Sequence, residues 1–181
     1  MKPIGPLMIE HRLIEKMLAS FMRYMDVAEM RQKIDPGLID TAVDFIRIYA
    51  DRTHHGKEEE ILFRALAKKD MAPDLKKIMQ ELISEHVWSR KTTTSLAQAN
   101  QGYLSGNGGR LSEILFLARE LGSFYPRHIE KEDEHFFVPA EEYLSKEEQA
   151  EMLTVFWEFD RKMIHEKYSQ IVEEYNSIVS R

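Results

Sequence analysis

The 181-residue sequence contains no cysteine. This absence excludes disulfides, thiolate catalysis, zinc ribbons and iron–sulfur ligation, and a chain of this length can form a core without cross-links. No basic stripe is present and the net charge is −6, so we expect no binding to nucleic acid. No apolar run approaches the ~20 residues that a membrane span requires, so we expect no membrane partner.

Signals for targeting and for strands are also missing. Residues 1–6 contain no signal-peptide apolar region, which makes the cytoplasm the expected location. We find no sustained two-residue alternation and no Asn-Gly hairpin between β-branched runs. The composition, with 43% apolar and 31% charged residues, is ordinary for a helical protein. We therefore predict an all-α fold.

Apolar residues at steps of three and four predict four long helices joined by short loops. Their approximate ranges are 6–30, 35–68, 73–101 and 110–136. Short loops make neighbouring helices antiparallel, so we predict an up-down-up-down four-helix bundle over about residues 7–138. A capping box at 145–148 opens an additional C-terminal helix over about 145–179. We expect a single domain, 1–181, with this helix outside the bundle or extending it.

A histidine and a carboxylate stand four residues apart in the second predicted helix. His54 and Glu58 interrupt an apolar stripe that includes Ile46, Ala50 and Ile61. Burying an unpartnered polar group costs roughly 2–7 kcal/mol, and burying an ion costs more. A bound cation would compensate this cost, so the pair is the first sign of a metal site.

Each of the other three helices also carries one histidine on its apolar stripe. Measured from the loop centres, histidines on neighbouring antiparallel helices match in height to within ~5 Å at a rise of ~1.5 Å per residue. One such histidine alone is more often a hydrogen-bonded core residue. Four at one level with two carboxylates would bury like charges without compensation unless a metal were bound. The candidate metal ligands are His11, His54, Glu58, His86, His128 and Glu132.

The order H…HxxxE…H…HxxxE resembles the hemerythrin family, in its bacterial HHE cation-binding branch, over about residues 7–140. The resemblance implies a four-helix bundle with two iron ions in a non-haem centre, bridged by the two carboxylates. Imidazole and carboxylate also suit manganese and zinc. Activities in the family include O2 binding, O2 or redox sensing, NO and peroxide handling, and iron–sulfur repair.

One departure from the oxygen carriers of the family affects the expected function. The carriers take two histidines, four residues apart, from the third helix and a bridging aspartate from the fourth. Here Leu82 and Arg90 stand four residues from His86, and the bridge is Glu132. Of about twelve positions on two six-coordinate irons, about two stay open, against one in a five-histidine carrier. This count favours sensing or turnover of a small molecule over O2 transport.

Other side chains could supply a fifth non-bridging ligand. We expect His55, rotated by ~100° from His54 on an α-helix, at the boundary of the interior or in contact with a ligand rather than as a ligand itself. We expect His135 at the end of the bundle and His165 away from the layer. Tyrosine candidates are Tyr49, Tyr103 and especially Tyr125. Candidates to orient the imidazoles through their other nitrogen are Glu10, Glu15, Glu59, Glu81 and Glu85.

Two functional hypotheses from different classes stay open. The first is a di-iron protein that binds O2, NO or peroxide and passes O2 or redox state to a protein redox or signalling partner. The second is an enzyme that turns over peroxide or NO, or that donates iron for iron–sulfur cluster repair. No catalytic residue is assigned, and the sequence selects neither the physiological ligand nor the oligomeric state.

Overall fold

The computed structural model describes the backbone of residues 2–179 and, within the last helix, the side chains up to Met163 and that of Lys167. In this part of the chain all regular elements are helices. The first bundle helix is α1 (Ile4–Arg31) and the third is α4 (Pro73–Leu104). The second bundle helix runs through α2 (Pro36–Phe45), η1 (Ile46–His55), η2 (Glu58–Phe63) and α3 (Arg64–Leu66). The fourth runs through α5 (Arg110–Glu130), η3 (Lys131–Phe136) and α6 (Phe137–Glu141), and is followed by α7 (Lys146–Val179).

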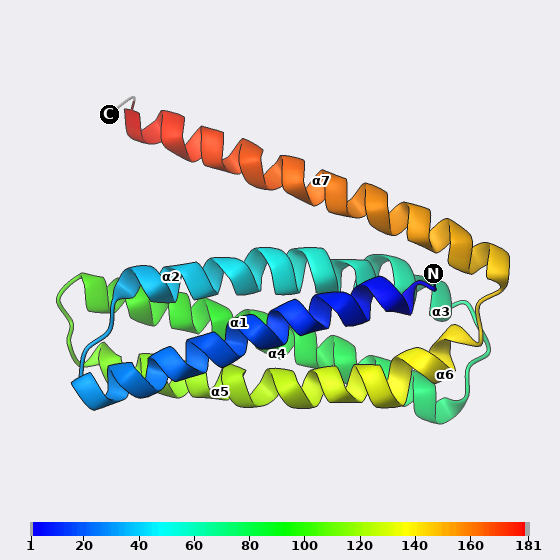
Figure 1. Ribbon diagram of the computed structural model, residues 1–181, viewed down its shortest axis with the longest axis horizontal. Coiled ribbons are helices and arrows are strands. Elements are labelled where there is room, and N and C mark those ends of the chain that lie inside the picture. Colours follow the sequence, from blue (N-terminus) through cyan, green and yellow to red (C-terminus); the bar gives the residue numbers. More distant parts are fainter. Residues whose placement is uncertain (1, 180–181) are drawn as a thin grey trace.

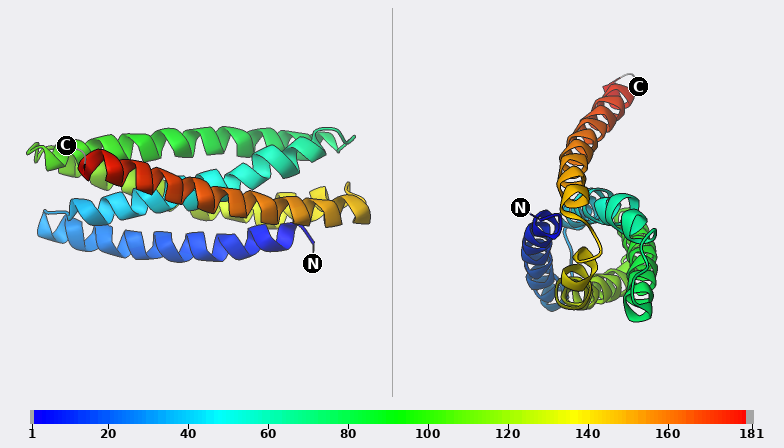
Figure 2. Two further views of the ribbon diagram at one scale, coloured as in Figure 1. Left: turned by 90° about the horizontal axis from the view of Figure 1, so that it is seen from above. Right: turned by 90° about the vertical axis from the view of Figure 1, so that its right-hand side faces the viewer.

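The four bundle helices lie side by side with alternating direction, as the pattern predicted (Figure 1). Seen from the end, they enclose one interior, and α7 lies outside it (Figure 2). The first part of α7 packs on η1 and η2 of the second bundle helix. The predicted four-helix bundle with an additional C-terminal helix is therefore confirmed.

Local signals in the sequence explain where the helices begin. Asp35 caps α2, because its Oδ1 accepts a hydrogen bond of 2.9 Å from the backbone N–H of Gly37. Proline occupies the first turn of both α2 and α4, where its missing N–H costs nothing. The capping box of α7 is formed: Ser145 Oγ accepts from Glu148 N at 3.2 Å, and Glu148 Oε2 accepts from Ser145 N at 2.8 Å.

The second and fourth bundle helices contain π-helical turns in their middle parts. The segments η1, η2 and η3 have wider turns than an α-helix and include both predicted glutamate ligands. In η1, the hydroxyl of Thr53 donates to the carbonyl of Ile48, five residues back, at 2.7 Å. The expectation of a regular α-helix through this region is wrong, and the difference affects which side chains reach the interior.

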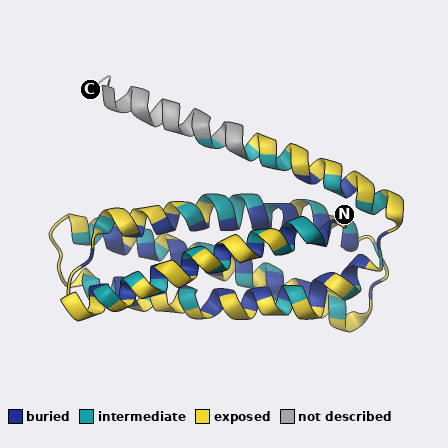
Figure 3. Ribbon diagram, viewed as in Figure 1, coloured by how far each residue is buried: buried dark blue, intermediate teal, exposed yellow. Residues whose placement is uncertain are grey.

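The apolar core consists of two parts with a layer of buried polar side chains between them. One part lies toward the loop after α1 and is centred on residues such as Leu18, Phe21 and Leu121. The other lies under the start of α7 and includes Leu82, Phe136 and Phe156. Figure 3 shows the buried positions on the inward faces of the bundle helices. Within the described residues, no helix is long and apolar enough to cross a membrane.

Candidate metal centre

The six residues predicted as ligands all lie in the buried layer between the two apolar cores. Their side chains are at most 2% exposed. The rings of His11 and His54 have centroids 4.5 Å apart, and His86 Nε2 lies 3.2 Å from His128 Nε2. The prediction that one histidine from each helix meets at a common level is therefore confirmed.

His55 also belongs to this layer, which corrects the expectation that it lies at the boundary of the interior. Its side chain is 1% exposed, and its ring stacks on that of His86 with a centroid distance of 3.9 Å. The α-helical rotation of ~100° between neighbours would place His55 beside the interior. The π-helical turn of η1 is wider, and it brings both His54 and His55 inward.

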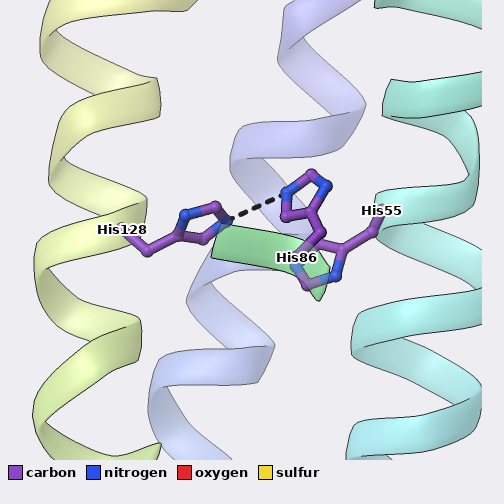
Figure 4. Close-up of side chains that lie close together, drawn as sticks. All are labelled: His55, His86 and His128. Atoms are coloured by element: carbon purple, nitrogen blue, oxygen red, sulfur yellow. Dashed lines mark hydrogen bonds between the residues drawn. The ribbon is translucent and has the colours of Figure 1, made fainter. Parts of the chain in front are cut away.

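The candidate ligands form two groups, and in each group one nitrogen or oxygen per residue lies within 4.8 Å of the others. The three-histidine group contains His55, His86 and His128. The mixed group contains His11, His54, Glu58 and Glu132. Figure 4 shows the three-histidine group, whose imidazoles come from three different bundle helices and point toward one another. Two adjacent groups of this composition could hold two metal ions.

Glu58 and Glu132 lie between the groups, and each turns one oxygen toward either side. Glu58 Oε1 lies 3.3 Å from His54 Nε2, and its Oε2 lies 3.4 Å from His86 Nε2. Glu132 Oε2 lies 3.1 Å from His11 Nε2, and its Oε1 lies 3.6 Å from His86 Nε2. Both carboxylates therefore face both groups, as a carboxylate that bridges two metal ions must.

The other ring nitrogen of each histidine faces an acidic side chain. Four Nδ1 atoms are hydrogen-bonded to carboxylates: His11 to Asp133 at 2.8 Å, His54 to Glu10 at 2.9 Å, His86 to Glu59 at 2.7 Å and His128 to Glu85 at 2.7 Å. The fifth, His55 Nδ1, lies 3.5 Å from Asp51. A proton on Nδ1 fixes the ring and leaves Nε2 as the metal-binding atom.

Basic side chains hold these outer carboxylates in turn. The pairs are Arg12 with Asp133 at 2.5 Å, Arg90 with Glu59 at 2.5 Å and with Asp51 at 2.6 Å, Lys57 with Glu10, and Lys131 with Glu85. Each carboxylate is thus fixed from two sides and its charge is balanced. The side chains around the imidazoles are consequently held in place before any metal binds.

The sequence identified only part of this outer set. Of the proposed partners, Glu10, Glu59 and Glu85 contact imidazoles. The other two do not, because Glu15 pairs with Arg12 and Glu81 pairs with Lys131. Asp51 and Asp133 were missed, although the first stands four residues before His55 and the second directly after Glu132. The i,i+4 spacing to a histidine could have indicated Asp51.

Without a cation, the two buried glutamates cannot both carry a charge at low cost. Burial raises the pKa of Glu58 well above its ordinary value, and the charge of Glu132 raises it further. Burial opposes ionisation of Glu132 too, but the neighbouring imidazoles of His128, His11 and His86 outweigh it and lower the pKa of Glu132 well below its ordinary value. The pKa values of the two glutamates are therefore shifted in opposite directions.

The pKa values of the imidazoles are also shifted in opposite directions. Burial and the neighbouring His11 lower the pKa of His54, and burial and the neighbouring His86 lower that of His55, so both rings are neutral. For His11, burial is outweighed by the hydrogen bond to Asp133 and by the nearby carboxylate of Glu132, which raise its pKa to about 9. A metal ion must displace the proton that His11 holds, so metal binding and proton release are coupled.

Unpaired buried atoms show that these residues fit a bound metal pair. Among the described residues, both oxygens of Glu58 and of Glu132 are buried without a hydrogen-bond partner. So are the Nε2 atoms of three histidines, His11, His54 and His55. Buried polar atoms are nearly always satisfied in proteins, and these point at one another across a small space. Cations bound in that space would satisfy all of them.

The remaining candidates from the sequence lie outside the two groups. Tyr125 is buried beside His55, with ring centroids 6.3 Å apart, but its hydroxyl pairs with Ser89 Oγ at 3.0 Å. His135 is exposed. The side chain of His165 lies outside the described residues. Tyr49 lines a cavity beneath α7, and Tyr103 packs, half-buried, against the core far from the layer.

The sequence matches the family model of the hemerythrin HHE cation binding domain over residues 2–140. No curated protein and no solved structure matches the chain. The matched range contains both groups of candidate ligands and all of the outer acidic and basic side chains, whereas α7 lies beyond it.

Proposed function

The chain belongs to the hemerythrin HHE cation-binding family, and from this premise we propose that it holds two iron ions and binds a small ligand such as O2, NO or peroxide. The ligands in this proposal are His55, His86 and His128 for one ion, His11 and His54 for the other, and Glu58 and Glu132 for both. An iron pair would supply the electrons with which such a ligand is bound or reduced.

The orientation of the two glutamates is the observation that supports this proposal most strongly. Each has one oxygen beside a histidine of either group, at 3.1–3.6 Å. A single metal ion would use only one side of this arrangement. A site without metal would bury four carboxylate oxygens unsatisfied, at several kcal/mol. Two cations satisfy all four oxygens at once.

Including His55 changes the number of open coordination positions. Five histidines, two bridging carboxylates and one oxygen bridge fill about eleven of about twelve positions on two six-coordinate ions. The coordination of an ion at the three-histidine group would then be complete, so the single open position would belong to an ion held by His11 and His54. This is the count of a five-histidine carrier, and the argument that two open positions favour turnover no longer applies.

The protein environment selects a small and weakly charged ligand for this position. All seven proposed ligands are at most 2% exposed, and apolar cores lie on both sides of the layer. Large substrates are therefore excluded, whereas a diatomic molecule or peroxide is small enough for such an enclosed position. The hydrogen bonds from Nδ1 to Asp133 and Glu10 hold His11 and His54 in orientation at the open side.

Ligand binding can be tested on protein that is loaded with ferrous iron in the absence of air. We expect O2, NO and peroxide each to change the visible absorption spectrum, with saturation at one ligand per two irons. Reversal of the O2 spectrum on removal of O2 would indicate carriage or sensing. Multiple turnover of peroxide or NO would instead support the enzymatic alternative. A fully loaded protein that responds to none of the three ligands would contradict the proposal.

A further inference from the structure

A buried lysine connects α7 with the outer acidic side chains of the metal centre. Lys57 is 0% exposed, and its Nζ forms ion pairs with Glu10 on α1 and, at 2.7 Å, with Asp160 on α7. The ring of Phe156, also on α7, lies 5.8 Å from the same Nζ. Burying a lysine is costly unless it is paired, so the two carboxylates are needed to keep Lys57 in this position.

The connection continues from Glu10 to a proposed metal ligand. One oxygen of Glu10 pairs with Lys57, and the other accepts the hydrogen bond from His54 Nδ1 at 2.9 Å. His54 belongs to the mixed group, whose metal ion has the open position in the proposed function. Asp160, Lys57, Glu10 and His54 thus form one continuous chain of contacts from α7 to that ion.

The contact between α7 and the second bundle helix is close, but only a few side chains form it. A Cβ added to Gly56 would lie 2.9 Å from Phe159 Cζ, so any larger residue would require the Phe159 ring to move. Phe156 is fully buried in the part of the apolar core that lies under the start of α7. Cavities of about 630 Å³ and 340 Å³ flank the contact, and the first is bordered by Glu10 and Asp160. The position of α7 therefore depends on a few side chains, and one of them is the partner of Lys57.

We infer that Asp160 and Lys57 are positioning residues through which the docking of α7 influences the oxidation equilibrium of the metal ion bound by His54. This coupling presupposes the metal pair proposed above. When Asp160 pairs with Lys57, less of the lysine charge acts on Glu10, and Glu10 is a stronger acceptor for His54 N–H. A stronger acceptor makes the imidazole a better donor to the metal and favours the oxidised state.

The coupling is reciprocal. If docking of α7 changes the oxidation equilibrium of the metal ion, the oxidation state must change the docking equilibrium of α7 by the same factor. The helix that lies beyond the family match is thereby assigned a role. The docking equilibrium of α7 differs between the oxidised and reduced forms of the metal centre. A molecule that binds α7 therefore shifts the oxidation equilibrium of the centre.

Substitution of Asp160 tests this coupling in the full-length, iron-loaded protein. We expect Asp160→Asn to keep two irons per chain and to shift the midpoint potential, measured by dithionite titration, to more positive values. Glu158→Gln removes the same charge from an exposed position on the same helix, and should leave the potential unchanged. In a Lys57→Met background, Asp160→Asn should cause no additional shift, because the chain of contacts is already broken.

Hydrogen exchange provides a second measurement that does not depend on the potential. The backbone amides of residues 152–160 should exchange more slowly in the oxidised, iron-loaded wild type than in its dithionite-reduced form, and Asp160→Asn should remove this difference. Circular dichroism of each variant establishes its helical content. If Lys57→Met does not fold, the exchange data decide.

Three results would overturn the inference. They are an unchanged potential in Asp160→Asn, an equal shift in Glu158→Gln, and a shift from Asp160→Asn that persists in the Lys57→Met background. A wild type that binds no iron would refute the proposed function instead, and iron analysis of every sample separates the two failures.

Discussion

His55 lies in the interior with its ring stacked on His86, and neither of its ring nitrogens has a hydrogen-bond partner. We therefore expect His55→Ala to lose metal as His54→Ala does, with a decrease of about 10–100-fold or more in affinity. His135→Ala is the matched control, because this exposed histidine lies on the same bundle helix as His128. Iron retention measured after desalting checks the prediction. Equal retention in the two variants would place His55 outside the coordination sphere.

Glu58 illustrates a conflict between stability and metal binding. In the metal-free protein it is fully buried beside Glu132, and no hydrogen bond satisfies its oxygens. Burial raises the pKa of Glu58, so keeping its carboxyl group in the interior costs folding free energy at neutral pH, and an uncharged amide of the same shape avoids this cost. We expect metal-free Glu58→Gln to unfold at a higher temperature than metal-free wild type, and to gain almost nothing from added iron.

Glu60→Gln controls for the loss of charge, because Glu60 is exposed on the same helix. Thermal unfolding of all three proteins, with and without ferrous iron, gives the comparison. A Glu58→Gln variant that is less stable than wild type without metal would show that the carboxyl group has a structural partner.

At the scale of single elements, the π-helical segment η1 determines which side chains enter the site. Thr53 Oγ1 donates to the Ile48 carbonyl across one wide turn. We expect Thr53→Val, which keeps the side-chain shape, to destabilise the protein by about 1 kcal/mol and also to lower iron affinity. Thr41→Val breaks a similar bond, to the Gly37 carbonyl in the α-helical part of the same bundle helix. It should reduce stability alone, and equal losses of affinity in both variants would refute a role for the wide turn.

The elements also show how far the sequence could predict this protein. Apolar steps of three and four, with proline and glycine at the ends, were sufficient to predict the bundle helices and the common level of His11, His54, His86 and His128. They were insufficient for His55, because periodicity arguments assume α-helical turns. No residue type marks a π-helical turn in advance, since the wide turns form through packing across the bundle.

The outer side chains were predictable only in part for a different reason. A carboxylate that contacts a histidine on another helix, such as Glu85 with His128, has no fixed spacing in the sequence. Lys57 stands in a charged stretch of the sequence, where nothing marks it as a buried residue. Its burial became apparent only with the position of α7, which covers it. Contacts between distant segments must therefore be taken from the structure.

At the scale of the whole molecule, α7 is part of the fold although it lies beyond the family match. Phe156 on α7 is fully buried in the part of the apolar core under the start of α7, while its neighbour Trp157 is 63% exposed. We expect Phe156→Ala to reduce the free energy of unfolding by about 3–5 kcal/mol. Trp157→Ala should change it by less than about 0.5 kcal/mol. Chemical denaturation of both variants measures the difference, and a small effect of Phe156→Ala would mean that α7 is not docked in solution.

The central claim is that five histidines and two glutamates in the middle of the bundle hold a pair of metal ions. Titration of metal-free protein with ferrous iron under anaerobic conditions, followed by desalting and metal analysis, tests it most directly. We predict that each chain retains two irons. Retention of a single iron, or of none by a correctly folded protein, would contradict the claim.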